Sequence, residues 1–432
     1  MQYRVRPGGC LTGECRVPGD KSISHRAVML GTLAEGVTEI QGFLEGEDSL
    51  ATLRAFCDMG VPIEGPSQGR LRIQGVGLYG LQTPPSVLDL GNSGTSMRLM
   101  AGLLAGQRFS STLAGDASLS KRPMRRVTEP LALMGAHIDT QDGHAPLVIQ
   151  GGRQLSGLRY RLPVASAQVK SCLLLAGLYA RGETWVSEPA PTRDHTERML
   201  AGFGYPVLQE GAAVGVRGGG RLQAFPIEIP SDISSAAFFL VGASIASGSS
   251  LRLLQVGMNP TRTGVVEILR RMGAHIRIEN PRSAGGEPVA DLWVESAPLT
   301  GIAIPESLVP LAIDEFPAVF IAAACATGET LLTGAAELRV KESDRIQVMA
   351  EGLATLGITA QPTPDGLRIQ GGILSGGHVM SHGDHRIAMA FAMAALRASG
   401  GIVIEDCANV ATSFPGFVAL ARAAGLGIEA NP

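Results

Sequence analysis

A pattern that recurs about every 72 residues constrains the fold of this 432-residue chain more than any other feature. In each copy, the end of an amphipathic helix is followed by glycine and then by a short β-like run. The six glycines are Gly60, Gly135, Gly204, Gly273, Gly357 and Gly427. A glycine in this place predicts a helix that ends with a positive φ angle and a strand that follows it.

A second pattern alternates with the first. Runs rich in small residues predict six further helices, each followed by glycine and a strand, at 26–34, 97–105, 169–180, 236–246, 318–326 and 387–398. A single glycine after a helix is common in any protein, whereas two alternating series of six are not. The sequence therefore predicts an α/β fold built from six copies of one unit, each with two helices and several strands.

The length suggests two or three domains, and six units divide naturally into two domains of three units with a cleft between them. Composition marks no clear boundary. The glycines at 218–220 and the segment 17–19 are plausible places for the chain to cross between domains. We therefore predict one domain from residues 1–18 and 229–432, and a second from residues 19–228.

Composition excludes several classes of function. A net charge of −3 without a long basic run argues against nucleic acid as a partner. No run reaches the roughly 18 apolar residues that cross a membrane. The six cysteines are widely spaced, which argues against a disulfide framework or a zinc ribbon. Because residues 1–8 hold no apolar signal core, we expect a cytoplasmic protein.

The predicted small-residue helices all begin with residues suited to anion binding. Asp, Ser or Asn can cap each start, at 19–22, 91–95, 165–168, 230–232, 313–315 and 382–386. Helix N-termini present free N–H groups and the positive end of the helix dipole. If these N-termini converge, the place where they meet binds anions.

Basic side chains lie near the same helix starts: Lys21, Arg26, the run 121–126, Arg193, Lys341, Arg345 and Arg386. Lys341 and Arg345 are four residues apart and would repel each other on a helix, so an anion between them would relieve that repulsion. Alternatively, Glu342 and Asp344 neutralise them on a solvated face. Taken alone, the run 121–126 is more typical of a solvated turn.

Isolated acidic residues and motifs give weaker signals. Asp314 and Asp384, each taken alone, are more typical of helix caps than of catalytic acids. Gly75–Gly80 matches a dinucleotide-binding pattern, but prolines follow where that pattern needs a helix. The histidines at 378, 382 and 385 lie in a glycine-rich turn without a further ligand, so we predict no metal site.

Six motifs together resemble those of the EPSP synthase family, the 3-phosphoshikimate 1-carboxyvinyltransferases, in a form similar to the bacterial class II. They lie at 19–26, 91–95, 118–124, 166–170, 340–345 and 383–388, in order along essentially the whole chain. The resemblance implies a two-domain inverted α/β barrel with three βαβαββ units in each domain. It also implies that substrates bind in the cleft and that the domains close on them.

The resemblance implies transfer of the enolpyruvyl group of phosphoenolpyruvate to the 5-hydroxyl of shikimate 3-phosphate, through a tetrahedral intermediate. This reaction serves chorismate and aromatic amino acid biosynthesis and needs no metal or organic cofactor. Glyphosate would be an inhibitor, and we expect a monomer that binds neither nucleic acid nor membrane.

The family's site residues can be placed on matching positions of this chain. Shikimate 3-phosphate would be bound by Lys21, Ser22, Arg26, Ser166, Ala167, Gln168, Arg193, Asp314 and Lys341. Phosphoenolpyruvate would be bound by Lys21, Gly94, Arg122, Gln168, Arg345 and Arg386. Asp314 and Glu342 would transfer protons, with Lys21 as a third catalytic group. Our hypothesis places Asp314 near the attacking hydroxyl and Glu342 near C3 of phosphoenolpyruvate.

Two features qualify the resemblance. Some members carry a lysine just before a late Phe-Pro pair, whereas residues 411–415 hold none. Gly94 predicts sensitivity to glyphosate, because tolerant relatives can place alanine there. Two alternatives stay open. The sister family acts on UDP-N-acetylglucosamine and usually has a cysteine where 115–121 has none. A non-catalytic anion-binding repeat protein would not need Asp314 and Glu342 beside the cations.

Overall fold

The computed structural model describes residues 1–431 and divides the chain into two compact units. Unit 1 contains Met1–Asp20, Pro230–Ser283 and the chain from Glu287 onwards, and unit 2 contains Lys21–Ile229 and Ala284–Gly286. These boundaries lie within two residues of those expected from the sequence. The expectation did not include residues 284–286, which lie at the turn of a hairpin and group with unit 2.

Unit 2 holds three mixed sheets. The first has the order β14-β3-β5-β4, with β15 also paired to β3, and the others have the orders β6-β7-β9-β8 and β10-β11-β13-β12. In the latter two, the first pair of strands is parallel and the remaining pairs are antiparallel. The strands are β3 (Ala34–Gln41), β4 (Ile63–Ser67), β5 (Arg70–Val76), β6 (Leu88–Asp89), β7 (Ser111–Ala114), β8 (Ile138–Gln141), β9 (His144–Ile149), β10 (Arg159–Arg161), β11 (Glu183–Ser187), β12 (Val207–Glu210), β13 (Ala213–Arg217), β14 (Leu222–Gln223) and β15 (Ile227–Glu228).

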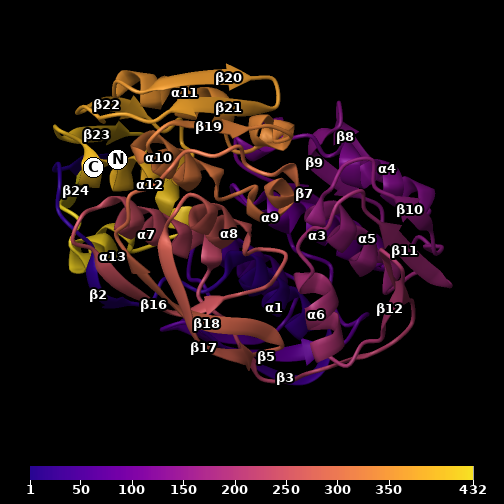
Figure 1. Cartoon of the computed structure of the whole chain (residues 1–432). Coiled ribbons are helices and arrows are strands. Elements are labelled where there is room, and N and C mark those ends of the chain that lie inside the picture. Colours follow the sequence, from indigo (N-terminus) through magenta and orange to yellow (C-terminus); the bar gives the residue numbers. More distant parts are fainter. Residues whose placement is uncertain (432) are drawn as a thin grey trace. The chain divides into compact units, whose positions relative to one another are not determined.

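The helices of unit 2 are of two kinds. Three are buried almost all round, because they consist mainly of small and apolar residues: α1 (Lys21–Leu33), α3 (Gly94–Ala105) and α5 (Ala167–Gly177). The other three bury one face: α2 (Glu47–Asp58), α4 (Arg125–Leu133) and α6 (His195–Gly202). Helices α3 and α5 lie side by side (Figure 1), and a Cβ atom at Gly102 would come within 2.1 Å of the Cys172 carbonyl oxygen. Glycine at that position is therefore required for the close packing of these helices.

Unit 1 also holds three sheets, with the orders β17-β18-β16-β2, β19-β21-β20 and β22-β23-β1-β24. In the last sheet, β1 pairs with β23 and β24, so the two ends of the chain share one sheet. The strands are β1 (Gln2–Val5), β2 (Thr12–Cys15), β16 (Ser250–Gly257), β17 (His275–Ala284), β18 (Glu287–Glu295), β19 (Glu329–Leu332), β20 (Thr359–Thr363), β21 (Gly366–Gln370), β22 (Gly377–Met380), β23 (Ile402–Glu405) and β24 (Ile428–Asn431).

The helices of unit 1 follow the same division. Helices α7 (Ile233–Ile245), α10 (Phe316–Cys325) and α12 (His385–Ala394) are buried along nearly their whole length. The others are α8 (Gly264–Arg271), α9 (Val309–Ala312), α11 (Arg345–Thr355) and α13 (Phe417–Ala424). Short 3-10 helices cover Leu119–Lys121, Glu306–Leu308, Ala336–Val340, Ala395–Arg397 and Ala408–Thr412. Each unit has its own hydrophobic core.

The α/β fold class is confirmed, and five of the six glycines predicted to end helices do so. Gly60, Gly135, Gly204, Gly273 and Gly357 have φ angles between +73° and +101°. The sixth prediction is wrong, because α13 ends at Ala424 and the next residue, Gly425, takes the left-handed conformation with φ of +119° in place of Gly427. The count of six equal repeats stays a prediction, since the sheets contain three, four or five strands.

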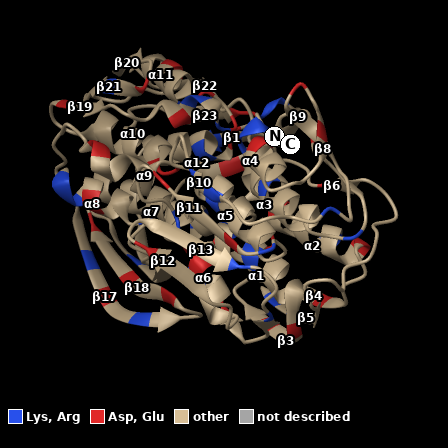
Figure 2. Cartoon of the chain, turned by 90° about the vertical axis from the view of Figure 1, so that its right-hand side faces the viewer, with Lys and Arg blue, Asp and Glu red and all other residues tan. Residues whose placement is uncertain are grey.

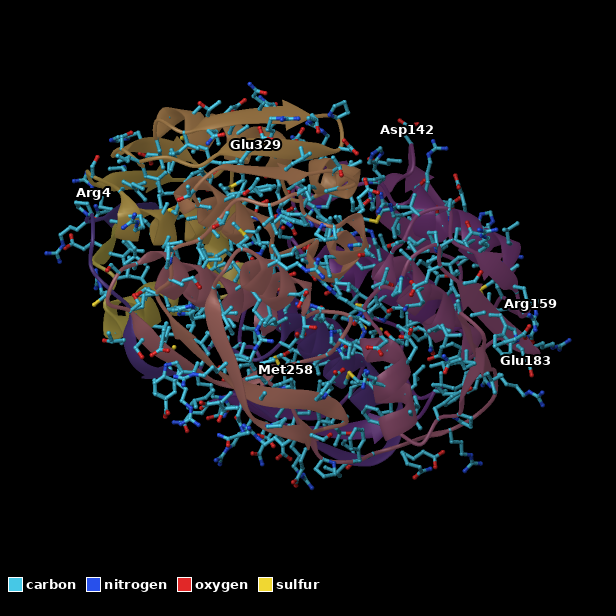
Figure 3. All side chains as sticks on the ribbon, in the orientation of Figure 1. Arg4, Asp142, Arg159, Glu183, Met258 and Glu329 are labelled. Atoms are coloured by element: carbon cyan, nitrogen blue, oxygen red, sulfur yellow. The ribbon has the colours of Figure 1, made fainter. Side chains whose placement is uncertain are left out.

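The surface carries many of the charged side chains, as at Arg159 and Glu183 on the neighbouring strands β10 and β11 (Figure 3). Among the described helices, none combines the length and the apolar character that crossing a membrane requires.

Candidate active site

In unit 2, hydrogen bonds connect the first two turns of α1, α3 and α5. Each bond joins two of these helices: His25 with Ser96 at 3.3 Å, Gln168 with Thr95 at 3.0 Å, and Arg26 with Ser171 at 2.8 Å. The N-terminal ends of these three helices therefore lie close together within unit 2. Their free N–H groups and dipoles favour an anion there.

Lys21 is the first residue of α1, and its ammonium group is held by an acid that sequence reasoning missed. Its Nζ lies 2.9 Å from Oδ2 of Asp48, the second residue of α2, and both side chains are mostly buried. Figure 2 shows basic positions along α1 in blue. Asp48 is 27 residues from Lys21, so no local pattern could have linked the two.

Arg26 is buried and makes hydrogen bonds with all three guanidinium nitrogens. Nε donates to Thr196 Oγ1 at 2.7 Å, Nη1 to the Ser22 carbonyl at 2.9 Å, and Nη2 to Ser171 Oγ at 2.8 Å. These bonds fix Arg26 against α5 and α6 and connect it to Ser22. Its predicted contact with substrate is not tested by these bonds and stays a prediction.

Gly94, Arg122 and Gln168, which were predicted to share one substrate, lie together. A Cβ atom at Gly94 would be 2.9 Å from Arg98 Nη1 and 3.2 Å from Arg122 Nη1. Arg98 Nη1 in turn donates to Gln168 Oε1 at 2.6 Å. Arg98 lies three residues after the motif 91–95 and was not assigned a role from the sequence.

The interpretation of 121–126 as a solvated turn is wrong for Arg122. This side chain is buried, and its Nη2 donates to Asn92 Oδ1 at 2.6 Å. The preceding loop folds back on the start of α3, because Asn92 Nδ2 donates to Asp116 Oδ2 at 2.8 Å. The hydrogen bond with Asn92, 30 residues away, thus holds Arg122 in a buried position. Arg125 and Arg126 are the first two residues of α4.

The remaining predicted residues of unit 2 lie at or beside helix starts. Ser166 caps α5 by accepting a hydrogen bond from the Val169 amide, and Ala167 is the first residue of the helix. Arg193 is half-buried in the segment directly before α6. The predicted site residues of unit 2 therefore all lie near the N-termini of helices or in the loops next to them.

Unit 1 repeats this arrangement with α7, α10 and α12. Asp232 caps α7 and Asp384 caps α12, each through a backbone N–H two residues ahead. Ser234 of α7 is hydrogen-bonded to Glu315, which immediately precedes α10. Arg386 of α12 donates to the Asp314 carbonyl at 3.0 Å.

Arg345, the first residue of α11, is the centre of the charged groups of unit 1. Its guanidinium is buried and lies 2.8 Å from Asp384, 2.5 Å from Glu342 and 3.3 Å from Asp314. Burial lowers the pKa of Arg345, but the carboxylates of Asp384, Glu342 and Asp314 outweigh it and raise the pKa above its usual value. Arg345 is therefore a permanent cation at this place.

Asp314 lies between two cations, which corrects two expectations. Its Oδ1 is 3.5 Å from Lys341 Nζ and 3.3 Å from Arg345 Nη1. Asp314 does not cap α10, where Glu315 occupies the capping position without a side-chain hydrogen bond. Lys341 precedes α11, so Lys341 and Arg345 do not repel each other on one helix but share Asp314. Asp384 does cap α12, as expected, and pairs with Arg345 as well.

Each of the three cations of this group has a carboxylate within 4.0 Å. Lys341 has Asp314 and Glu337, Arg345 has Asp314, Glu342 and Asp384, and Arg386 has Glu315. An incoming anion can therefore bind the cations by replacing a carboxylate. Glu342 is the most exposed of the three acids beside Arg345, with 23% of its side chain accessible, against 13% for Asp314 and 0% for Asp384.

Comparisons with known proteins find relatives along essentially the whole chain. A sequence model of the family EPSP synthase (3-phosphoshikimate 1-carboxyvinyltransferase) matches residues 5–420. A protein of Alkalilimnicola ehrlichii with that enzyme name is 71% identical over 430 residues, covering 99% of this chain and 96% of its own. A protein of Methylococcus capsulatus with the same name is 69% identical, covering 99% and 98%. The 2.37 Å structure of EPSP synthase from Acinetobacter baumannii matches with a TM-score of 0.90 at 59% identity and covers both chains completely.

The fold and the relatives define an enzyme, a carboxyvinyltransferase. The chain belongs to the EPSP synthase family. This membership supports enolpyruvyl transfer in aromatic amino acid biosynthesis as its activity.

Proposed function

We propose that the chain transfers the carboxyvinyl group of phosphoenolpyruvate to the 5-hydroxyl of shikimate 3-phosphate by means of the side chains described above. The observation that carries this proposal is the position of Asp314, a carboxylate between Lys341 at 3.5 Å and Arg345 at 3.3 Å. A base held between cations can accept a proton while the cations bind the anions around it. The alternative, a non-catalytic anion-binding protein, would not require a proton acceptor at this place.

Both substrates carry a phosphate and a carboxylate, so their joint binding requires many cations. We assign shikimate 3-phosphate to Lys21, Ser22, Arg26, Ser166, Ala167, Gln168, Arg193, Asp314 and Lys341. We assign phosphoenolpyruvate to Lys21, Gly94, Arg122, Gln168, Arg345 and Arg386. Arginine suits these anions because its planar guanidinium makes paired hydrogen bonds with phosphate and carboxylate. The assignment draws on residues of both units.

The first chemical step is an addition. The 5-hydroxyl oxygen forms a bond to C2 of phosphoenolpyruvate while Asp314 takes the hydroxyl proton. The C2–C3 double bond supplies the electron pair that takes a proton from Glu342 at C3. The product is a tetrahedral intermediate in which C2 carries the new ether oxygen, the phosphate, the carboxylate and the methyl group that C3 has become.

The second step is an elimination. Glu342 takes a proton back from C3, the C2–C3 double bond forms again, and the bond between C2 and the phosphate oxygen breaks. The proton held by Asp314 leaves with the phosphate. Lys341 stabilises the negative charge near the attacking oxygen, and the arginines stabilise the phosphate that departs.

Binding of phosphoenolpyruvate requires Arg345 to exchange partners. Asp384 is fully buried and holds Nε at 2.8 Å, so it keeps Arg345 in place. Glu342 contacts Nη2 from the loop before α11 and is partly exposed. The substrate anion therefore displaces Glu342 from Nη2, and the displaced carboxyl group becomes available for protonation and for transfer to C3.

Three finer points belong to the same proposal. Glyphosate carries a phosphonate and a carboxylate and would bind to the cations assigned to phosphoenolpyruvate. We infer a monomer, because all assigned residues lie on one chain. We infer a cytoplasmic location, because phosphorylated metabolites such as these substrates are made and kept inside the cell.

Deuterium exchange tests the role of Glu342. When the enzyme turns over in D₂O, reversible protonation places deuterium at C3 of phosphoenolpyruvate. We expect Glu342→Gln to reduce this exchange by at least about 100-fold, as removal of a general acid does. Exchange at the wild-type rate in Glu342→Gln would refute the assignment, while phosphate release by the wild type would still support the reaction.

A further inference from the structure

Lys170 is a buried lysine for which the proposed reaction has no use. It lies in α5, within the motif 166–170, and only 2% of the residue is exposed. Its Nζ lies 3.0 Å from Glu188 Oε1 and 2.8 Å from Glu197 Oε1. Burial lowers the pKa of Lys170, but Glu197 and Glu188 outweigh it and raise the pKa above its usual value. Lys170 is therefore charged and held by two acids.

One of these acids also holds the backbone of a loop. Glu188 Oε1 accepts a hydrogen bond from the Thr192 amide at 2.9 Å, and Oε2 accepts one from Thr192 Oγ1 at 2.5 Å. Lys170 Nζ itself lies 3.4 Å from the Thr192 carbonyl oxygen. Residues 188–194, between β11 and α6, form no helix or strand. Hydrogen bonds from side chains, and not those of a sheet or a helix, therefore hold the main chain of this loop in place.

The residue that follows Thr192 is Arg193, which we assign to shikimate 3-phosphate. The next turn belongs to α6, where Thr196 Oγ1 accepts from Arg26 Nε at 2.7 Å. Thr196 Oγ1 also donates to Ser171 Oγ at 2.7 Å, and Ser171 is the neighbour of Lys170. Two adjacent residues of α5 thus fix the segment that carries Arg193 and the side chain of Arg26.

We propose that Lys170 is a positioning residue for the binding of shikimate 3-phosphate. It anchors Glu188, Glu188 holds the main chain and hydroxyl of Thr192, and Thr192 fixes the place of Arg193. This inference rests on the proposed function, because it takes Arg193 as a ligand of that substrate. Glu197, which lies in α6, has a different role. It balances the charge of Lys170, and none of its described hydrogen bonds is to Thr192.

The two glutamates provide a matched test. Glu188→Gln and Glu197→Gln each remove one of the two negative charges beside Lys170. In the wild type, the two carboxylate oxygens of Glu188 accept from three donors: Lys170 Nζ, the Thr192 amide and the Thr192 hydroxyl. The glutamine of Glu188→Gln offers these donors only one oxygen. We therefore expect Glu188→Gln to weaken the binding of shikimate 3-phosphate by about tenfold or more, and Glu197→Gln to change it by less than about twofold.

The measurement is isothermal titration of the full chain with shikimate 3-phosphate in the absence of phosphoenolpyruvate. Melting temperatures of the three proteins report how much each substitution destabilises the fold. We also expect Glu188→Gln to raise the KM for shikimate 3-phosphate while the KM for phosphoenolpyruvate stays within about twofold. A role in stability alone would predict equal effects of both substitutions on affinity, and such a result would overturn the proposal.

A double-mutant cycle checks the route through Arg193. If Glu188 acts by positioning Arg193, Arg193→Ala weakens binding less in the Glu188→Gln background than in the wild type. Additive losses would contradict this route. If the wild type itself does not bind shikimate 3-phosphate, the proposed function fails and this inference fails with it. If the wild type binds and both glutamate variants bind equally well, only the inference fails.

Discussion

Arg345 Nε lies 2.8 Å from Asp384 Oδ2, and neither side chain is more than 1% exposed. Asp384 also caps α12, so one buried carboxylate joins the start of α11 to the start of α12. A buried pair of this kind adds little to stability when compared with an apolar replacement, but removing one partner leaves the other buried without compensation. The pair therefore fixes the position of Arg345. Its contribution to the free energy of unfolding is measured by removing one of the two partners.

Asp384→Asn tests this relationship, because asparagine still caps a helix but no longer pairs with Arg345 as a charge. We expect the free energy of unfolding to fall by about 3 kcal/mol or more in urea titrations. The control is a substitution at Glu329, which is labelled in Figure 3. Glu329→Gln breaks an exposed pair with Arg368. That substitution should cost less than about 1 kcal/mol. Equal losses for the two variants would contradict the structural role of Asp384.

Asp314→Asn tests the base in the addition step. The substitution keeps the size of the side chain and the carbonyl that Arg386 contacts, but it removes the proton acceptor. We expect kcat, measured at a temperature at which both proteins are folded, to fall by about 100-fold or more. The control is Glu337→Gln, which removes a carboxylate 4.0 Å from the same Lys341 and should leave kcat within about twofold. Near-normal turnover by Asp314→Asn would refute its role.

Gly94→Ala tests the space beside the two arginines. The new Cβ atom would lie 2.9 Å from Arg98 Nη1, which is held by Gln168, and 3.2 Å from Arg122 Nη1. Because the guanidinium groups must shift, we expect the KM for phosphoenolpyruvate to rise by about tenfold and inhibition by glyphosate to weaken. The control is Gly401→Ala, whose nearest neighbour is 3.4 Å away. An unchanged KM for phosphoenolpyruvate in Gly94→Ala would contradict the assignment of Gly94 to the binding of that substrate.

Because the thiol of Cys172 is buried, we expect the protein to lose stability at alkaline pH. Burial raises the pKa of Cys172 from 9.0 to about 12. Because the folded-state pKa lies above the unfolded one, the stabilising effect is complete below about pH 8.5 and is lost as pH rises towards 12. Within this range the wild type should lose about 1.4 kcal/mol per pH unit more than Cys172→Ala. Urea midpoints at pH 8, 9, 10 and 11, corrected by the slopes of the transitions, would measure the difference, and parallel curves would contradict it.

Features that depend on nearby residues could be predicted from the sequence. The glycines that end α2, α4 and α11 and the aspartates that begin α7 and α12 act within a few residues of their own positions. The cations at helix starts were found for the same reason. Lys21, Arg345 and Arg386 all lie in the first turn of a helix.

Features that depend on distant partners could not be predicted. The pairing of Lys21 with Asp48 and the burial of Arg122 by Asn92 join residues that only the tertiary fold brings together. Lys341 and Arg345 were predicted to lie on one helix, because the sequence does not show that α11 begins only at Arg345. The roles of Asp314, Glu342 and the other assigned residues in binding and proton transfer stay predictions.

The most direct test of the account is phosphate release by the purified chain, with phosphoenolpyruvate and no added metal. One tube contains shikimate 3-phosphate, and a parallel tube contains UDP-N-acetylglucosamine. The account predicts stoichiometric release of phosphate in the first tube and none in the second. Release only with the nucleotide sugar, or no release from a folded protein in either tube, would contradict it.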